Sequence, residues 1–132
     1  MNIKLFSSIL NVKKALLSGG YSDTVLFTHS LGSWLAMILL IEDYLTPEEK
    51  KQIKGIVMCS PAINFFAIYF AKFMEHLEKL GDTDTIERLQ KNKLVRGAFN
   101  IPYKLDFKDS SVKHEIDVSD SDQMHKISIP VR

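Results

Sequence analysis

Residues 24–41 read TVLFTHSLGSWLAMILLI and decide the fold. The segment opens with an apolar, β-branched run at 25–28, which is typical of a buried strand. It then passes through residues 29–32 and continues as a second apolar run, whose pattern favours a buried helix. The segment therefore predicts a strand that turns sharply into a helix, with a single serine at the turn.

A membrane span is the alternative interpretation of this segment, because it carries no charge. A transmembrane helix needs about 20 predominantly apolar residues. Residues 34–41 are too short for this by themselves, and the first half is interrupted by Thr24, Thr28, His29, Ser30, Gly32 and Ser33. We therefore predict a buried strand followed by a buried helix, and no membrane span.

Ser30 lies in the pentapeptide THSLG, which is close to the G-x-S-x-G pattern of a nucleophile elbow. In such a turn the serine adopts a strained backbone conformation that exposes its hydroxyl. Strand and helix approach closely there, so we expect little room for a side chain two positions before and two after the serine. Gly32 meets this requirement, whereas Thr28 departs from it. The alternative is an ordinary turn in which Ser30 caps the helix.

The sequence here resembles the α/β-hydrolase family, and the resemblance extends beyond the turn. Residues 56–62 (IVMCSPA) are similar to the family strand that follows the elbow helix, and residues 127–132 (ISIPVR) are similar to the entry into its next parallel strand. The resemblance implies that Ser30 is the catalytic nucleophile and that the backbone N–H of Leu31 is one oxyanion-hole donor. It also implies hydrolysis of a small acyl ester, thioester or amide through an acyl-enzyme, with no cofactor.

Composition predicts one soluble globular domain. The chain has 132 residues, 45% of them hydrophobic and 25% charged, and a net charge of +1, which gives no sign of nucleic-acid binding. The single cysteine, Cys59, excludes an internal disulfide and suits a reducing compartment, so we predict a cytoplasmic location and a buried thiol. No metal site is predicted, because close pairing and cysteine partners are missing for His29, His76, His114 and His125.

The segments around the elbow predict further helices and a second strand. Apolar residues recur at three- and four-residue steps over residues 1–18, which indicates an amphipathic helix in preference to a signal peptide. Thr46, Pro47 and Glu49 predict the start of a short helix with a capping box. Residues 53–60 predict a second buried strand. Strand, helix and strand together indicate a right-handed crossover between parallel strands.

Residues 63–125 are interpreted as a lid-like insertion. Helical spacing over residues 62–80 places a row of apolar side chains on one side, and we expect this row to pack in a core: Phe66, Phe70, Phe73, Leu77 and Leu80. Alternatively, some of these rings line an acyl pocket. Polar caps at residues 82–84 predict another helix at about 85–93.

The pattern after residue 97 is weaker. Apolar alternation between Tyr103 and Val118 is compatible with extended pieces. We expect His76 to be solvated and predict a catalytic role for neither His114 nor His125.

The expected architecture is a partial α/β-hydrolase fold, with two or three parallel strands flanked by helices. Residues 1–62 form the elbow core, 63–125 the lid-like insertion and 126–132 the start of a further strand. The family order of nucleophile, acid and histidine leaves this chain with only the nucleophile. We therefore predict a truncated serine hydrolase that lacks the triad acid and histidine and is inert or slow by itself. A complementary chain that supplies Asp and His would restore activity.

Two other classes of function stay open. The first is a non-catalytic interaction module derived from a decayed hydrolase, whose exposed sheet edges favour pairing with another chain. The second is a nucleotide-binding βαβ domain. That class needs a glycine-rich phosphate loop, which the sequence at 29–33 does not contain.

Overall fold

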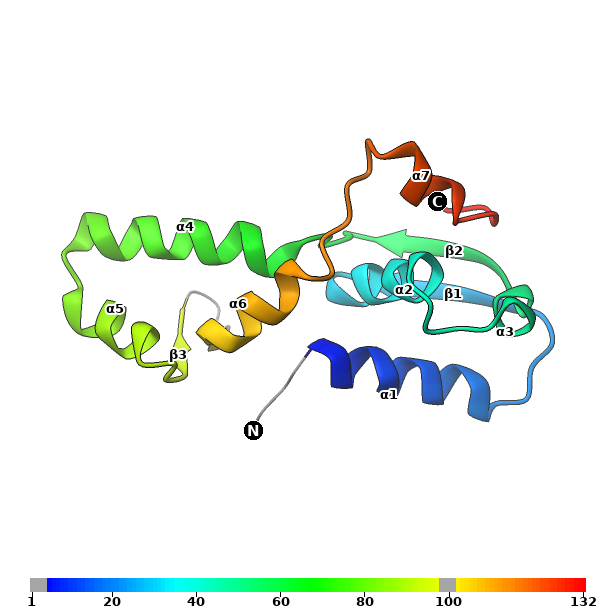
Figure 1. Ribbon diagram of the computed structural model, residues 1–132, viewed down its shortest axis with the longest axis horizontal. Coiled ribbons are helices and arrows are strands. Elements are labelled where there is room, and N and C mark those ends of the chain that lie inside the picture. The colour runs from blue at the N-terminus through cyan, green and yellow to red at the C-terminus, as the bar shows by residue number, and fades with distance from the viewer. Residues whose placement is uncertain (1–4, 98–101) are drawn as a thin grey trace. The chain divides into compact units, whose positions relative to one another are not determined.

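The computed structural model describes residues 5–97 and 102–132 (Figure 1). Contacts within the chain divide it into two compact units. The sheet unit is built from Phe6–Ile63 and Glu115–Arg132, and the helical unit from Asn64–His114. The candidate nucleophile belongs to the sheet unit.

A small parallel sheet organises the sheet unit. Its strands β1 (Thr24–His29) and β2 (Ile53–Cys59) pair in parallel, in register from Val25 opposite Gly55 to His29 opposite Cys59. The connection between them contains α2 (Leu31–Ile41) and α3 (Pro47–Lys51). The predicted parallel pairing is thus confirmed, and the fold is of the mixed α/β class.

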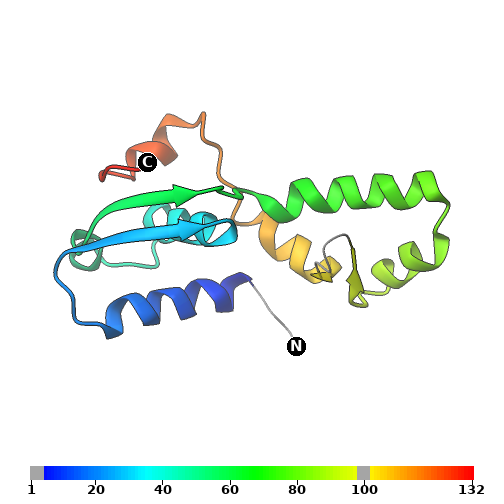
Figure 2. The ribbon, with the colours of Figure 1, turned by 180° about the vertical axis from the view of Figure 1, so that it is seen from behind.

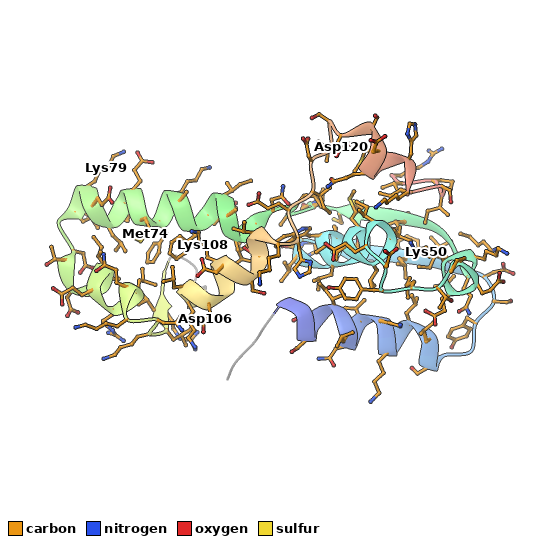
Figure 3. All side chains as sticks on the ribbon, viewed as in Figure 1. Lys50, Met74, Lys79, Asp106, Lys108 and Asp120 are labelled. Carbon is orange, nitrogen blue, oxygen red and sulfur yellow. The ribbon has the colours of Figure 1, made fainter. Side chains whose placement is uncertain are left out.

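A third segment also pairs with β2. Val131 forms a parallel bridge with Ile56. The N–H of Ile56 donates to the carbonyl of Pro130 at 3.0 Å, and the N–H of Arg132 donates to the carbonyl of Ile56 at 2.9 Å. Shortly before this segment, Asp120 caps the short helix α7 (Ser121–His125) through its carboxylate (Figure 3). Residues far apart in the sequence therefore complete the sheet.

Helix α2 supplies most of the core of the sheet unit. All of its residues from Ser33 onward are buried, and Trp34, Ile38 and Leu39 have no exposed surface. An uncharged, apolar helix of this kind is stable only when it is buried on all sides. The helix ends at Ile41, because Glu42 adopts an extended backbone (φ −90°, ψ 163°).

Of the two helices that flank this core, α1 ends and α3 begins where the sequence predicts. Helix α1 spans Leu5–Ser18 and buries Ile9, while residues 1–4 of the predicted helix lie outside the described residues. At the start of α3, the Thr46 hydroxyl accepts from the N–H of Glu49 at 3.2 Å, and the Glu49 carboxylate accepts from the N–H of Thr46 at 3.3 Å. The predicted capping box is confirmed.

One face of the sheet is open in the part of the chain that the structure describes. Figure 2 shows β1 and β2 in front of α2. Apolar residues in both strands are exposed: Val25 by 51%, Phe27 by 80% and Val57 by 38%. Cys59, predicted to be buried, is exposed as well. That prediction was wrong because Cys59 ends β2 on this open face, opposite His29 in the register.

The helical unit packs α4 (Phe65–Leu80) against α5 (Thr83–Gln90) and the strand β3 (Val95–Arg96), which pairs with β4 (Pro102–Tyr103). Its core consists of Leu77, Leu89 and Val95, with Phe70, Phe73, Met74 and Ile86 packed around it. On the other side of α4, Lys79 pairs with Glu75 in solvent at 2.6 Å (Figure 3).

One prediction for this unit was wrong. Leu80 is 66% exposed, because it is the last residue of α4, directly before Gly81 in the left-handed conformation. The weak pattern after Tyr103, for which extended pieces were one possibility, contains the helix α6 (Leu105–Val112). The apolar row on α4 is otherwise confirmed, since its other members are buried or pack against the core.

Candidate functional site

Ser30 occupies the turn between the end of β1 and the start of α2. Its backbone has φ 51° and ψ −122°. A residue with a β-carbon rarely adopts a positive φ, and such conformations are strained by about 1–3 kcal/mol. The strained turn that the pentapeptide predicts is therefore present in the structure.

Backbone hydrogen bonds hold Ser30 in this conformation. Its N–H donates to the carbonyl of Cys59 at 3.1 Å, which ties the turn to the end of β2. Its carbonyl accepts from the N–H groups of Ser33 and Ala62, each at 3.1 Å. The turn is thus fixed by the helix that follows it and by the loop after β2. A strained residue persists when its surroundings determine its conformation in this way.

Ser30 does not act as a helix cap. A capping serine has an extended backbone, and its hydroxyl accepts from an N–H in the first turn. Ser30 has neither property within the described residues, whereas Thr46 has both at the start of α3. The capping interpretation of Ser30 was therefore wrong, and Ser30 is a half-buried residue whose hydroxyl does not cap α2.

The positions two before and two after Ser30 differ from the expectation of tight packing. Thr28 fits at the first position, where its Oγ1 lies 2.9 Å from the Oγ of Ser33 and donates to the carbonyl of Val57 at 3.4 Å. At the second position, a β-carbon added to Gly32 would have no described atom within 4 Å. The expectation of little room was wrong, because hydroxyl contacts and not close backbone approach join β1 to α2 here.

Sequence reasoning gave no role to Ser33, which is fully buried. The available signal was a hydroxyl inside an otherwise apolar helix. Buried hydroxyl groups need a hydrogen-bond partner, and Thr28 is the partner that the structure supplies.

Leu31 is the first residue of α2, directly after Ser30. The first four N–H groups of a helix have no acceptor within the helix, and they form the positive end of its dipole. The first turn of α2 carries no acidic side chain. An oxygen that gained negative charge beside Ser30 would therefore meet a favourable field at this end of α2.

Within the described residues of the sheet unit, no histidine or carboxylate forms a hydrogen bond with the Ser30 hydroxyl. His29 is exposed at the end of β1, His125 is exposed in α7, and His76 is exposed on α4. His114 lies after α6 in the helical unit. Residues 60–64, which follow β2 beside the turn, contain no carboxylate. Among the described residues, no group of three or more histidine, cysteine or acidic side chains could hold a metal ion.

Two shallow hollows lie at the amino ends of the strands, away from Ser30. One has a volume of about 430 Å³ and is lined by residues that include Lys50 and Ile53 (Figure 3). The other has about 510 Å³ and is lined by residues that include Tyr21 and Asp23. Ser30 lies at the carboxyl end of β1, so neither hollow is a substrate pocket for its hydroxyl. No helix in residues 5–97 and 102–132 is long and apolar enough to cross a membrane.

Comparisons with models of protein families, with curated proteins and with solved structures found no match. The α/β-hydrolase interpretation therefore stays a prediction from residues 28–32 and the segments similar to that family. What the structure shows is coarser, namely a mixed α/β chain with a small parallel sheet flanked by helices.

Proposed function

We propose that this chain is a serine hydrolase of the α/β-hydrolase type with Ser30 as its nucleophile. The observation that carries the proposal is the backbone of Ser30, with φ 51° and ψ −122° at a strand-to-helix turn. Strained residues cluster at functional sites, where a fixed geometry is part of the mechanism. The substrate class is a small acyl ester, thioester or amide.

In the proposed reaction, the Ser30 Oγ attacks the carbonyl carbon to give a tetrahedral intermediate. Its collapse breaks the bond from the acyl carbon to the alcohol, thiol or amine, which leaves with a proton, and the resulting acyl-enzyme is hydrolysed by water to the carboxylic acid and free Ser30. The N–H of Leu31, at the start of α2, donates to the oxyanion of the tetrahedral intermediate. A serine hydroxyl is a weak nucleophile until an adjacent base removes its proton. The proposal assigns this base to an Asp–His pair on a complementary polypeptide. The cytoplasmic location of the chain also stays a prediction.

Covalent labelling with a fluorophosphonate tests the proposal, with imidazole added to the buffer as an external base. We expect an adduct on Ser30, found by peptide mass spectrometry, that forms faster with imidazole and disappears in S30A. Ser60 offers a matched control, because it also directly follows a strand and has a positive φ of 47°. The variant S60A should label like the wild type. Absence of any Ser30 adduct in both buffers would overturn the proposal.

A second candidate function is favoured by the outer edge of β1. Within the described residues β1 pairs only with β2, so the backbone groups of Val25, Phe27 and His29 on its other edge have no strand partner. Natural edge strands usually carry charges or proline as protection, and residues 24–28 contain neither. In this alternative, the chain is an interaction module whose β1 pairs with β1 of a second copy.

A further inference from the structure

Two hydroxyl groups bridge the turn that contains Ser30. Thr28 lies near the end of β1, and Ser33 lies in the first turn of α2, so the pair flanks Ser30 on both sides. Their oxygens are 2.9 Å apart. The Thr28 hydroxyl also donates to the carbonyl of Val57 on β2 at 3.4 Å. One chain of hydrogen bonds therefore links α2, β1 and β2 around the turn.

We propose that this pair, the Thr28–Ser33 clasp, positions Ser30 by holding the turn in its strained conformation. Thr28 and Ser33 are positioning residues, since they act through the backbone and not on a substrate. The part of this inference that concerns the reactivity of Ser30 rests on the proposed function. Its structural part, the link between the clasp and the turn, can be tested separately.

The burial of Ser33 makes the clasp specific. Ser33 has no exposed surface, so water cannot replace Thr28 as its partner without an opening of the structure. A buried hydroxyl that loses its partner carries the full penalty of its desolvation. Removal of the Thr28 hydroxyl thus favours movement of the first turn of α2 away from β1. That movement frees Ser30 to relax toward a negative φ.

On the helix side of the turn, side-chain packing at Gly32 does not add to the backbone hydrogen bonds that hold Ser30. A β-carbon at this position would meet no described atom within 4 Å other than its chain neighbours and the backbone of α2, so close approach of strand and helix does not fix the turn there. The clasp therefore takes the place of the small-residue packing that the G-x-S-x-G pattern implies. This also explains how a threonine is accommodated at position 28.

The test compares T28V, S33A and the double variant T28V/S33A with the wild type. T28S, which keeps the hydroxyl, is the conservative rescue, and T24V is the matched control at the other end of β1. The first measurement is amide hydrogen exchange at Ser30 and Ala62, because the N–H of Ser30 donates to the carbonyl of Cys59 and the N–H of Ala62 donates to the carbonyl of Ser30. The second is the rate of fluorophosphonate labelling in imidazole buffer.

We expect T28V to lower the protection of both amides and the labelling rate by about tenfold. T28S and T24V should stay close to the wild type. T28V also lowers the Tm, by about 4 °C or more, because it leaves Ser33 unpaired. The double variant should regain most of this Tm, since both hydroxyls are gone, while protection and labelling stay low. If the clasp only stabilised the fold, the double variant would recover its Tm, its amide protection and its labelling rate together.

Amide protection in T28V and the double variant equal to that in T24V would overturn the inference. Wild-type labelling separates this failure from failure of the proposed function. If the wild type forms no Ser30 adduct, the proposed function fails, and the exchange measurement alone then decides whether the clasp holds the turn.

Discussion

At the scale of single residues, the strain at Ser30 is the feature with the largest consequence. The positive φ places its β-carbon against the backbone, and the strain is offset by hydrogen bonds to Cys59 and Ala62. Glycine has no β-carbon and adopts this conformation without that strain. The strain at Ser30 can therefore be measured as a difference between two variants.

We predict that S30G is more stable than S30A by about 1 kcal/mol. Both variants lose the hydroxyl, but only glycine removes the clash of the β-carbon. Part of the stability that S30G gains is lost again, because glycine gives the unfolded chain more conformational freedom. Urea denaturation followed by circular dichroism measures the difference. An S30A variant as stable as S30G would show that Ser30 is unstrained.

The pentapeptide was sufficient to predict the strain at Ser30, because a turn this sharp between strand and helix leaves few backbone conformations. The hydroxyl contact between Thr28 and Ser33 could not be predicted, since it depends on the separation of β1 and α2. The exposure of Cys59 was missed for a similar reason. An apolar run does not show which face of a strand stays uncovered.

At the scale of elements, α5 shows how one side chain begins a helix. The Asp82 carboxylate accepts from the Thr85 hydroxyl at 2.7 Å and from the Thr85 N–H at 3.1 Å. The bond from the hydroxyl has the larger effect, and together the two bonds lower the pKa of Asp82 below its ordinary value of 3.8. The folded state therefore binds the Asp82 proton more weakly than the unfolded state does.

We predict that the contribution of Asp82 to stability is complete above pH 3.8 and is lost as the pH falls through its lowered pKa. A carboxyl-carbon NMR titration should place its midpoint below that of an unpaired aspartate. Denaturation of D82N, which keeps a capping side chain without the charge, should depend less on pH in the acid range. A midpoint for Asp82 at or above 3.8 would contradict the prediction.

Elements with local signals were predicted well, and those that depend on distant contacts were not. The capping box of α3 lies entirely within residues 46–49, so the sequence alone reveals it. Helix α6 instead begins where the N–H of Asp106 donates to the side chain of Asn92 at 3.0 Å. A start signal supplied from another part of the chain leaves no local pattern, and the sequence after Tyr103 therefore did not predict this helix.

At the scale of the whole molecule, the unpaired edge of β1 bears on self-association. Antiparallel pairing of two copies centred on Phe27 would set Val25 against His29 and bring no like charges together. Each copy would also cover apolar side chains of the other copy that are exposed in the single chain. The same sheet would then contain strands from two molecules.

We predict that this pairing produces a dimer and that F27K weakens it by at least about tenfold, because a lysine at an edge opposes strand addition. Analytical ultracentrifugation over a range of concentrations measures the effect. V57K is the matched control, since Val57 is on the same open face but in β2, inside the sheet. A wild-type chain that stays monomeric, or an F27K variant that dimerises normally, would contradict the prediction.

The bridge between Ile56 and Val131 has a consequence for the order of folding. All of the helical unit, Asn64–His114, is translated between these two partners. Closing so long a loop is entropically unfavourable and slows the contacts that depend on it. On the ribosome, β1, α2 and β2 emerge before residues 130–132 are synthesised. Until then, the edge of β2 that pairs with these residues has no strand partner. This interval is when a nascent chain would most need protection by a chaperone.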